Sequence, residues 1–120
     1  MKDGLKSYFV KEWALLLFLL VPIIVAVVVY PLMPEVVPTH WNAQGQVDGY
    51  SGRVFGTFFL PLMNVGLYIL LFFAPKLDPK KDNYASFAST YRVIRWMIHI
   101  LMVVVYAFTI RAALGDAMDV

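Results

Sequence analysis

The chain has no cysteine among its 120 residues, so a disulfide, a thiolate metal site and a cysteine nucleophile are all excluded. Charged residues are scarce as well, at 15%, against about 25% in soluble domains. Hydrophobic residues reach 61%, which is more than so short a chain can bury in one water-soluble core. A formal charge of +2 is too small to indicate nucleic-acid binding. Lipid is therefore the expected solvent.

Three long apolar runs contain no acidic residue. They cover residues 13–30, 55–73 and 93–110, and each approaches the ~20 residues that cross ~30 Å of hydrocarbon. The first run ends in Pro31 without a small-residue cleavage site, so we interpret it as a retained anchor rather than a signal peptide. The sequence predicts an all-α integral membrane protein with three transmembrane helices in a single domain, residues 1–120. Loops at residues 31–54 and 74–92 connect the helices. Arg95, near the start of the third run, is expected to snorkel to the interface.

Basic residues are distributed unevenly around these runs. One set lies before the first run or around the second loop: Lys2, Lys6, Lys11, Lys76, Lys80, Lys81, Arg92 and Arg95. The first loop has only Arg53, and the C-terminal tail has only Arg111. The positive-inside bias predicts a multi-pass protein of the cell membrane with a cytoplasmic N-terminus, an extracytoplasmic first loop and an extracytoplasmic C-terminus.

The first loop has the composition of an ordered segment rather than a flexible connector. Its prolines restrict the residues before them, whereas Gly45 and the pair Asp48-Gly49 are turn signals. Trp41 and Tyr50 supply amphipathic rings suited to the headgroup region. We therefore expect a compact loop that lies on the outer membrane face.

A long motif in this loop resembles a known family. The motif reads Pro38-Thr39-His40-Trp41-Asn42-x-x-Gly45-x-x-Asp48-Gly49-Tyr50 and follows Pro31, Pro34 and Val36. Together with the flanking apolar runs it resembles the N-terminal membrane domain of the SdpI family. That resemblance implies immunity against a secreted peptide toxin and the holding of a transcriptional repressor at the membrane. Full-length members carry a further membrane region, so what transfers to this chain is a set of positions: His40, Trp41, Asn42, Gly45, Asp48, Gly49 and Tyr50.

The loop residues have structural and functional interpretations. His40 with Asp48 or Glu35 offers imidazole and carboxylate ligands for a divalent metal, but one histidine and two separate carboxylates form no recognised spacing. We favour hydrogen bonds from His40 and Asn42 that order the loop, with recognition of an extracellular peptide or a lipid headgroup as the alternative. No metal site, cofactor or catalytic residue is predicted, because no nucleophile motif or phosphate loop is present.

Polar features also occur inside the apolar runs at similar depth. Pro22 leaves the carbonyl of Phe18 without its helical donor, Asn64 lies at the centre of the second run, and His99 lies near the centre of the third. Polar groups at this depth are expected to face other helices. We predict that Asn64 and His99 meet inside the bundle, with the Phe18 carbonyl as a further acceptor.

These features favour a non-enzymatic binding, sensing or immunity-like membrane module that acts through its outer loop. Its expected partners are the lipid bilayer, a peptide or another membrane protein, and a second copy of the chain. The alternative is a small transporter or channel subunit that uses Asn64 and His99 as a polar path. An enzyme built on His40 and Asp48 is the least favoured hypothesis, since no second carboxylate accompanies Asp48 at short spacing.

Overall fold

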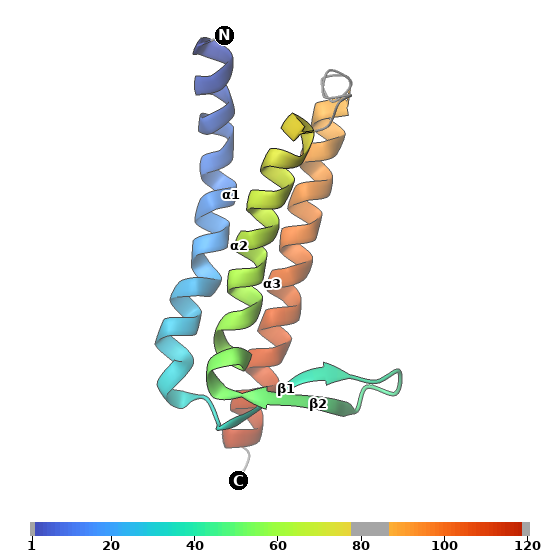
Figure 1. The fold of residues 1–120 in the computed structure, drawn as a ribbon. Coiled ribbons are helices and arrows are strands. Elements are labelled where there is room, and N and C mark those ends of the chain that lie inside the picture. The colour runs from blue at the N-terminus through green and yellow to red at the C-terminus, as the bar shows by residue number, and fades with distance from the viewer. Residues whose placement is uncertain (1, 78–86, 119–120) are drawn as a thin grey trace.

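Three long helices and one β-hairpin make up the protein. The computed structural model describes residues 2–77 and 87–118, with side chains described for residues 12–77 and 87–115. Helix α1 spans Lys2–Val29, α2 spans Arg53–Leu77 and α3 spans Ala88–Met118. They lie side by side as an elongated bundle, with α1 and α3 running in one direction and α2 returning between them (Figure 1).

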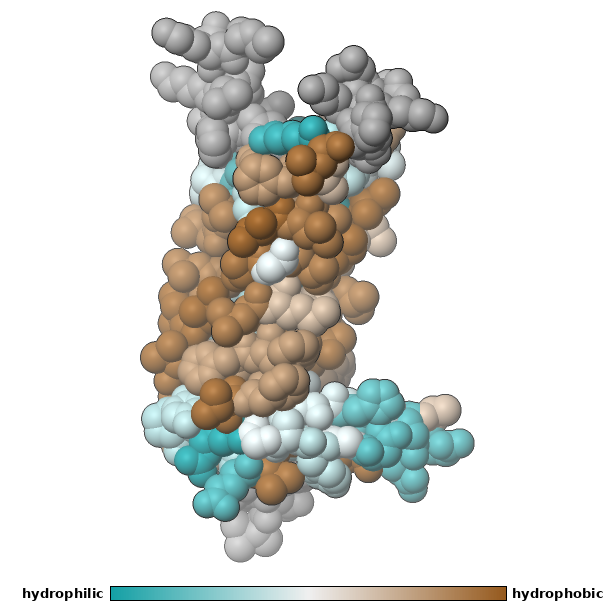
Figure 2. All heavy atoms as spheres, in the orientation of Figure 1, coloured by the Kyte–Doolittle hydropathy of each residue, from teal (hydrophilic) through white to brown (hydrophobic). Residues whose placement is uncertain are grey.

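Each helix is long and apolar enough to cross a membrane. The candidate spans are Glu12–Leu32, Arg53–Leu77 and Ala88–Gly115. Large apolar side chains stay exposed along them, with Val28 65% and Phe108 64% exposed. On the face drawn in Figure 2, hydrophobic side chains cover the helices as a broad apolar belt, and a hydrophilic region lies over the hairpin. Three helices of this length and composition are those of a multi-pass membrane protein, whose apolar side chains face lipid.

The helices extend beyond the predicted spans. Residues 74–77 of the predicted second loop belong to α2, although Pro75 lies among them, and residues 88–92 belong to α3. Prolines are tolerated in membrane helices because neighbouring groups satisfy the freed carbonyls. The remainder of that predicted loop, residues 78–86, lies outside the described residues. We call the end of the bundle with Lys76 and Arg92 the basic end, and the opposite end the hairpin end.

The segment predicted as a loop contains a two-stranded sheet, so the expectation of a purely α-helical chain was incomplete. A short 3-10 helix, η1 (Tyr30–Leu32), follows α1, and strands β1 (Val36–Trp41) and β2 (Val47–Gly52) pair antiparallel. Both strands contain the β-branched and aromatic residues that favour extended backbone. Pro38 interrupts the alternation, but a two-stranded hairpin has only edge strands, where proline is accepted.

The hairpin, residues 36–52, is anchored to the bundle at its base. Val37 of β1 is fully buried and clusters with Met33 and with Ala113 of α3. On α2, a Cβ placed at Gly56 would lie 2.5 Å from the Cβ of Val37, so only glycine lets the strand come this close. From this base the two strands extend sideways beyond the helices (Figure 1).

Candidate functional site

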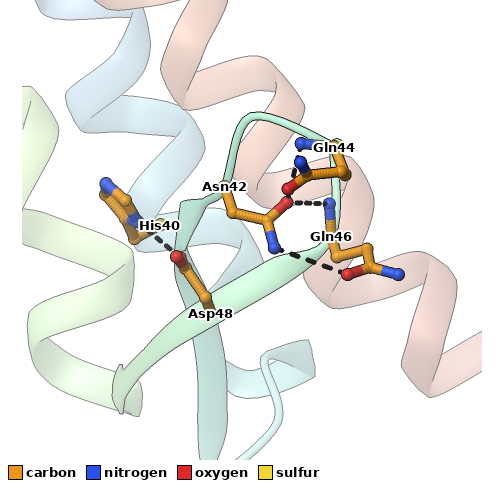
Figure 3. Close-up of polar contacts among 5 residues, drawn as sticks. All are labelled: His40, Asn42, Gln44, Gln46 and Asp48. Carbon is orange, nitrogen blue, oxygen red and sulfur yellow. Dashed lines mark hydrogen bonds and ion pairs between the residues drawn. The ribbon is translucent and has the colours of Figure 1, made fainter.

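The tip of the hairpin is closed by the side chain of Asn42. Its Oδ1 accepts hydrogen bonds from the backbone N–H groups of Gln44 and Gln46, both at 3.0 Å. The backbone N–H of Asn42 also donates to the Gln46 carbonyl at 2.8 Å. Gly45 has φ +78°, the left-handed conformation that glycine adopts without strain. Figure 3 shows this tip, in which one amide oxygen holds two backbone donors that would otherwise be exposed to solvent.

His40 and Asp48 form a cross-strand pair on the body of the hairpin. With its proton on Nδ1, His40 donates to Asp48 Oδ1 across 2.5 Å (Figure 3). The two side chains are 72% and 41% exposed, so the pair lies on the surface. Gly49 is the pairing partner of His40, and a Cβ there would come within 2.9 Å of the His40 Cβ. Asp48 and Gly49 thus set the conformation of His40, whose side chain stays accessible to solvent.

The aromatic residues of the motif have different environments. Tyr50 is 62% exposed, whereas Trp41 is partly buried at the end of β1. Exposed Tyr50 and His40 on the two paired strands offer stacking and hydrogen bonding to a ligand. Among the described residues, no group of three metal-ligating side chains comes together, and Glu35 is absent from the ion pairs of this region.

A small pocket lies where the hairpin meets the bundle. Thr39 of β1, Phe55 and Phe59 of α2, and Thr109 of α3 contribute to a cavity of about 220 Å³. Thr109 donates its hydroxyl to the Val105 carbonyl, so that polar group is already satisfied. The pocket therefore offers mainly apolar and aromatic surface to a ligand.

Inside the bundle, Asn64 and His99 are in contact, as their depth predicted. The imidazole Nδ1 and the Asn64 Oδ1 are 2.6 Å apart, and the Asn64 Nδ2 donates to the His99 carbonyl at 3.4 Å. Since the amide oxygen accepts, the proton of a neutral His99 belongs on Nδ1. Within the described part of the chain, its Nε2 is buried and has no hydrogen-bond partner. Pro22 is buried in α1, but the Phe18 carbonyl takes no part in this contact, contrary to our expectation.

A buried ion pair lies between this contact and the basic end. Arg95 of α3 donates to both carboxylate oxygens of Glu12 of α1, at 2.7 and 3.1 Å. Tyr68 of α2 donates to the same carboxylate at 2.8 Å, so all three helices meet here. The residues Arg95 and Glu12 are 4% and 5% exposed. The expectation that Arg95 snorkels was therefore wrong, because a carboxylate inside the bundle satisfies its charge.

This network was missed because Glu12 lies outside the first predicted run and Arg95 was expected to snorkel. Glu12 lies directly before the first predicted run and Arg95 two residues inside the third. Since the two helices run parallel, those positions share one depth, and opposite charges at one depth predict pairing. Toward the hairpin end, Tyr106 of α3 donates to the Thr57 carbonyl of α2 at 2.7 Å. Polar contacts between helices thus recur along the whole bundle.

A family model matches part of the chain. Residues 17–65, which cover the C-terminal part of α1, the hairpin and the first half of α2, match the model of a domain of unknown function, DUF1648. No curated protein and no solved structure matches the chain. The matched region contains the whole hairpin and Asn64, whereas Glu12, Tyr68, Arg95 and His99 lie outside it.

Proposed function

We propose that this membrane protein is a non-enzymatic binding or sensing module whose hairpin contacts a partner at the membrane surface. The observation that carries the proposal is a hairpin fixed at both ends that leaves His40 and Tyr50 exposed between them. Fixing the backbone beforehand lowers the entropy that binding would otherwise cost. A mere connector between α1 and α2 would need neither the Asn42 tip nor the close contact of Val37 with Gly56.

The distribution of basic residues supports a cytoplasmic N-terminus and an extracytoplasmic hairpin and C-terminus in the cell membrane. The resemblance to the N-terminal domain of the SdpI family supports a peptide as the partner and an immunity-like role. The overhang of the hairpin beside the helices favours a partner that lies at the membrane surface (Figure 1).

Site-specific crosslinking in intact cells tests this proposal. A photoreactive phenylalanine analogue replaces Tyr50 on the hairpin or, as the control, Leu101, which is 62% exposed on the apolar belt. We expect Tyr50 to give a protein or peptide adduct of discrete mass, which Asn42→Ala weakens because the tip loses its order. The same adducts from Leu101, or none from Tyr50, would contradict a binding role for the hairpin.

Self-association is a second part of the proposal. Three helices bury little of their own surface, and a second copy or another membrane protein would cover part of the rest. Light scattering of the detergent-purified chain is expected to give more than one protomer per particle. A particle mass equal to one chain plus detergent would contradict self-association.

The buried polar contacts favour one alternative, a small transporter or channel subunit. Buried polar groups occupy two successive depths in the bundle. The first contains Glu12, Arg95 and Tyr68, and the second, nearer the bundle centre, contains His99 and Asn64. The pocket under the hairpin is not lined by Asn64 or His99, which favours the binding module. Proton flux into liposomes that His99→Leu abolishes would support transport, and equal flux in both proteins would argue against it.

A further inference from the structure

A groove between α1 and α3 has apolar walls, and Arg111 lies at one end of it. Pro22 and Val25 of α1 face Val103 and Ala107 of α3 across a cavity of about 280 Å³, and Arg111 contributes to its lining. The Tyr106 hydroxyl does not add a free polar group to this lining, because it donates to the Thr57 carbonyl. The lining of the groove is thus apolar throughout, and Arg111 contributes its apolar stem to it.

The groove opens toward the surrounding lipid. Val21 and Val25 on one wall are 55% and 36% exposed, and Ala107 on the other wall is exposed as well. From Val103 to Arg111 the groove follows α3 for roughly 12 Å, at 1.5 Å per residue. Arg111 lies toward the hairpin end, and the apolar lining continues from it toward the bundle centre. An acyl chain attached to a headgroup at Arg111 would run in this direction.

Arg111 supplies a positive charge at the end of the groove. Its side chain is exposed, and no ion pair found in the described part of the chain includes it. A guanidinium binds phosphate oxygens through two parallel hydrogen bonds. In a zwitterionic lipid the ammonium group of the headgroup competes for the same phosphate, whereas an anionic lipid leaves it available.

We infer that the groove between α1 and α3 is a binding site for one anionic phospholipid, with an acyl chain along Val25 and Val103 and the phosphate on Arg111. The inference does not depend on the proposed role of the hairpin. The bound lipid would come from the leaflet at the hairpin end, and it would be a specific ligand of the protein rather than part of the general lipid annulus.

Native mass spectrometry of the detergent-purified chain tests the site. Phosphatidylglycerol and phosphatidylcholine with identical acyl chains are titrated separately, and the dissociation constant of the first bound lipid is measured. We expect phosphatidylglycerol to bind more tightly, and Arg111→Gln to weaken it about tenfold, the loss typical of charge-assisted hydrogen bonds. Arg92→Gln is the matched control, because it removes one exposed charge from the basic end of the same helix.

A second variant tests the apolar part of the site. Ala107→Leu fills the groove from an exposed position, so the core of the bundle stays unchanged. It is expected to weaken the binding of phosphatidylglycerol while Arg111 remains in place. Three results would overturn the inference: equal affinity for both lipids, an equal loss in Arg111→Gln and Arg92→Gln, or unchanged binding in Ala107→Leu.

Discussion

Replacing Gly56 with alanine is the sharpest perturbation that the structure offers for the attachment of the hairpin. The new Cβ would lie 2.5 Å from the Cβ of Val37 and 2.6 and 2.9 Å from its two Cγ atoms. Carbon atoms in contact are normally about 3.5–4.0 Å apart, so one element has to move by about 1 Å. The clash involves a Cβ next to the strand backbone, so a rotamer change cannot relieve it, and β1 itself must shift. Overpacking of this kind costs about 1–3 kcal/mol.

Gly66→Ala is the matched control on the same helix. A Cβ at Gly66 meets no heavy atom within 4 Å, and the residue is exposed. Because alanine is favoured over glycine in a helix by up to about 1 kcal/mol, this variant should be neutral or more stable. The measurement is the free energy of unfolding in mixed micelles titrated with a denaturing detergent. If Gly56→Ala unfolds at the same point as Gly66→Ala, the close packing of β1 on α2 is refuted.

Three further predictions concern the polar contacts. Glu12→Gln and Arg95→Gln should each lower the free energy of unfolding by about 3–5 kcal/mol, because each leaves one buried charge unpaired; a double variant with the summed loss would contradict the pair. Asn64→Leu and His99→Leu should show a coupling energy of about 1 kcal/mol in a double-mutant cycle, and strictly additive effects would exclude their contact. Asn42→Ala should speed hydrogen exchange at the two tip amides that its oxygen accepts from, and unchanged protection factors by NMR would show that the backbone alone holds the tip.

Hydropathy predicted the three helices because a membrane span needs a continuous apolar run and little else. The same property explains why the helices run past the predicted spans. The predicted third span ends at residue 110, but α3 continues to Met118, since Ala113 packs on Met33 and Val37. Tertiary packing, rather than transfer into lipid, stabilises those last turns. A hydropathy window contains no information about such packing.

The candidate site was predictable where a single residue sets the local backbone. Gly45 was identified as a turn residue and has positive φ, and Asn42 was expected to order the loop and closes the tip. The strand pairing was not predicted, because Pro38 breaks the alternating pattern that identifies strands. The pair of Glu12 with Arg95 was not predicted either, because depth was compared only for residues inside the apolar runs and Glu12 lies just before the first one.

Cysteine accessibility tests the central claim most directly, because the native chain has no cysteine to interfere. Gln44→Cys places a thiol at the exposed hairpin tip, and Leu77→Cys places one at the basic end, where the native side chain is 80% exposed. In intact cells, a membrane-impermeant maleimide should label residue 44, and it should label residue 77 only after the membrane is opened. Labelling of residue 77 in intact cells, or of both residues to the same extent, would contradict a membrane-spanning bundle with the hairpin on its outer face.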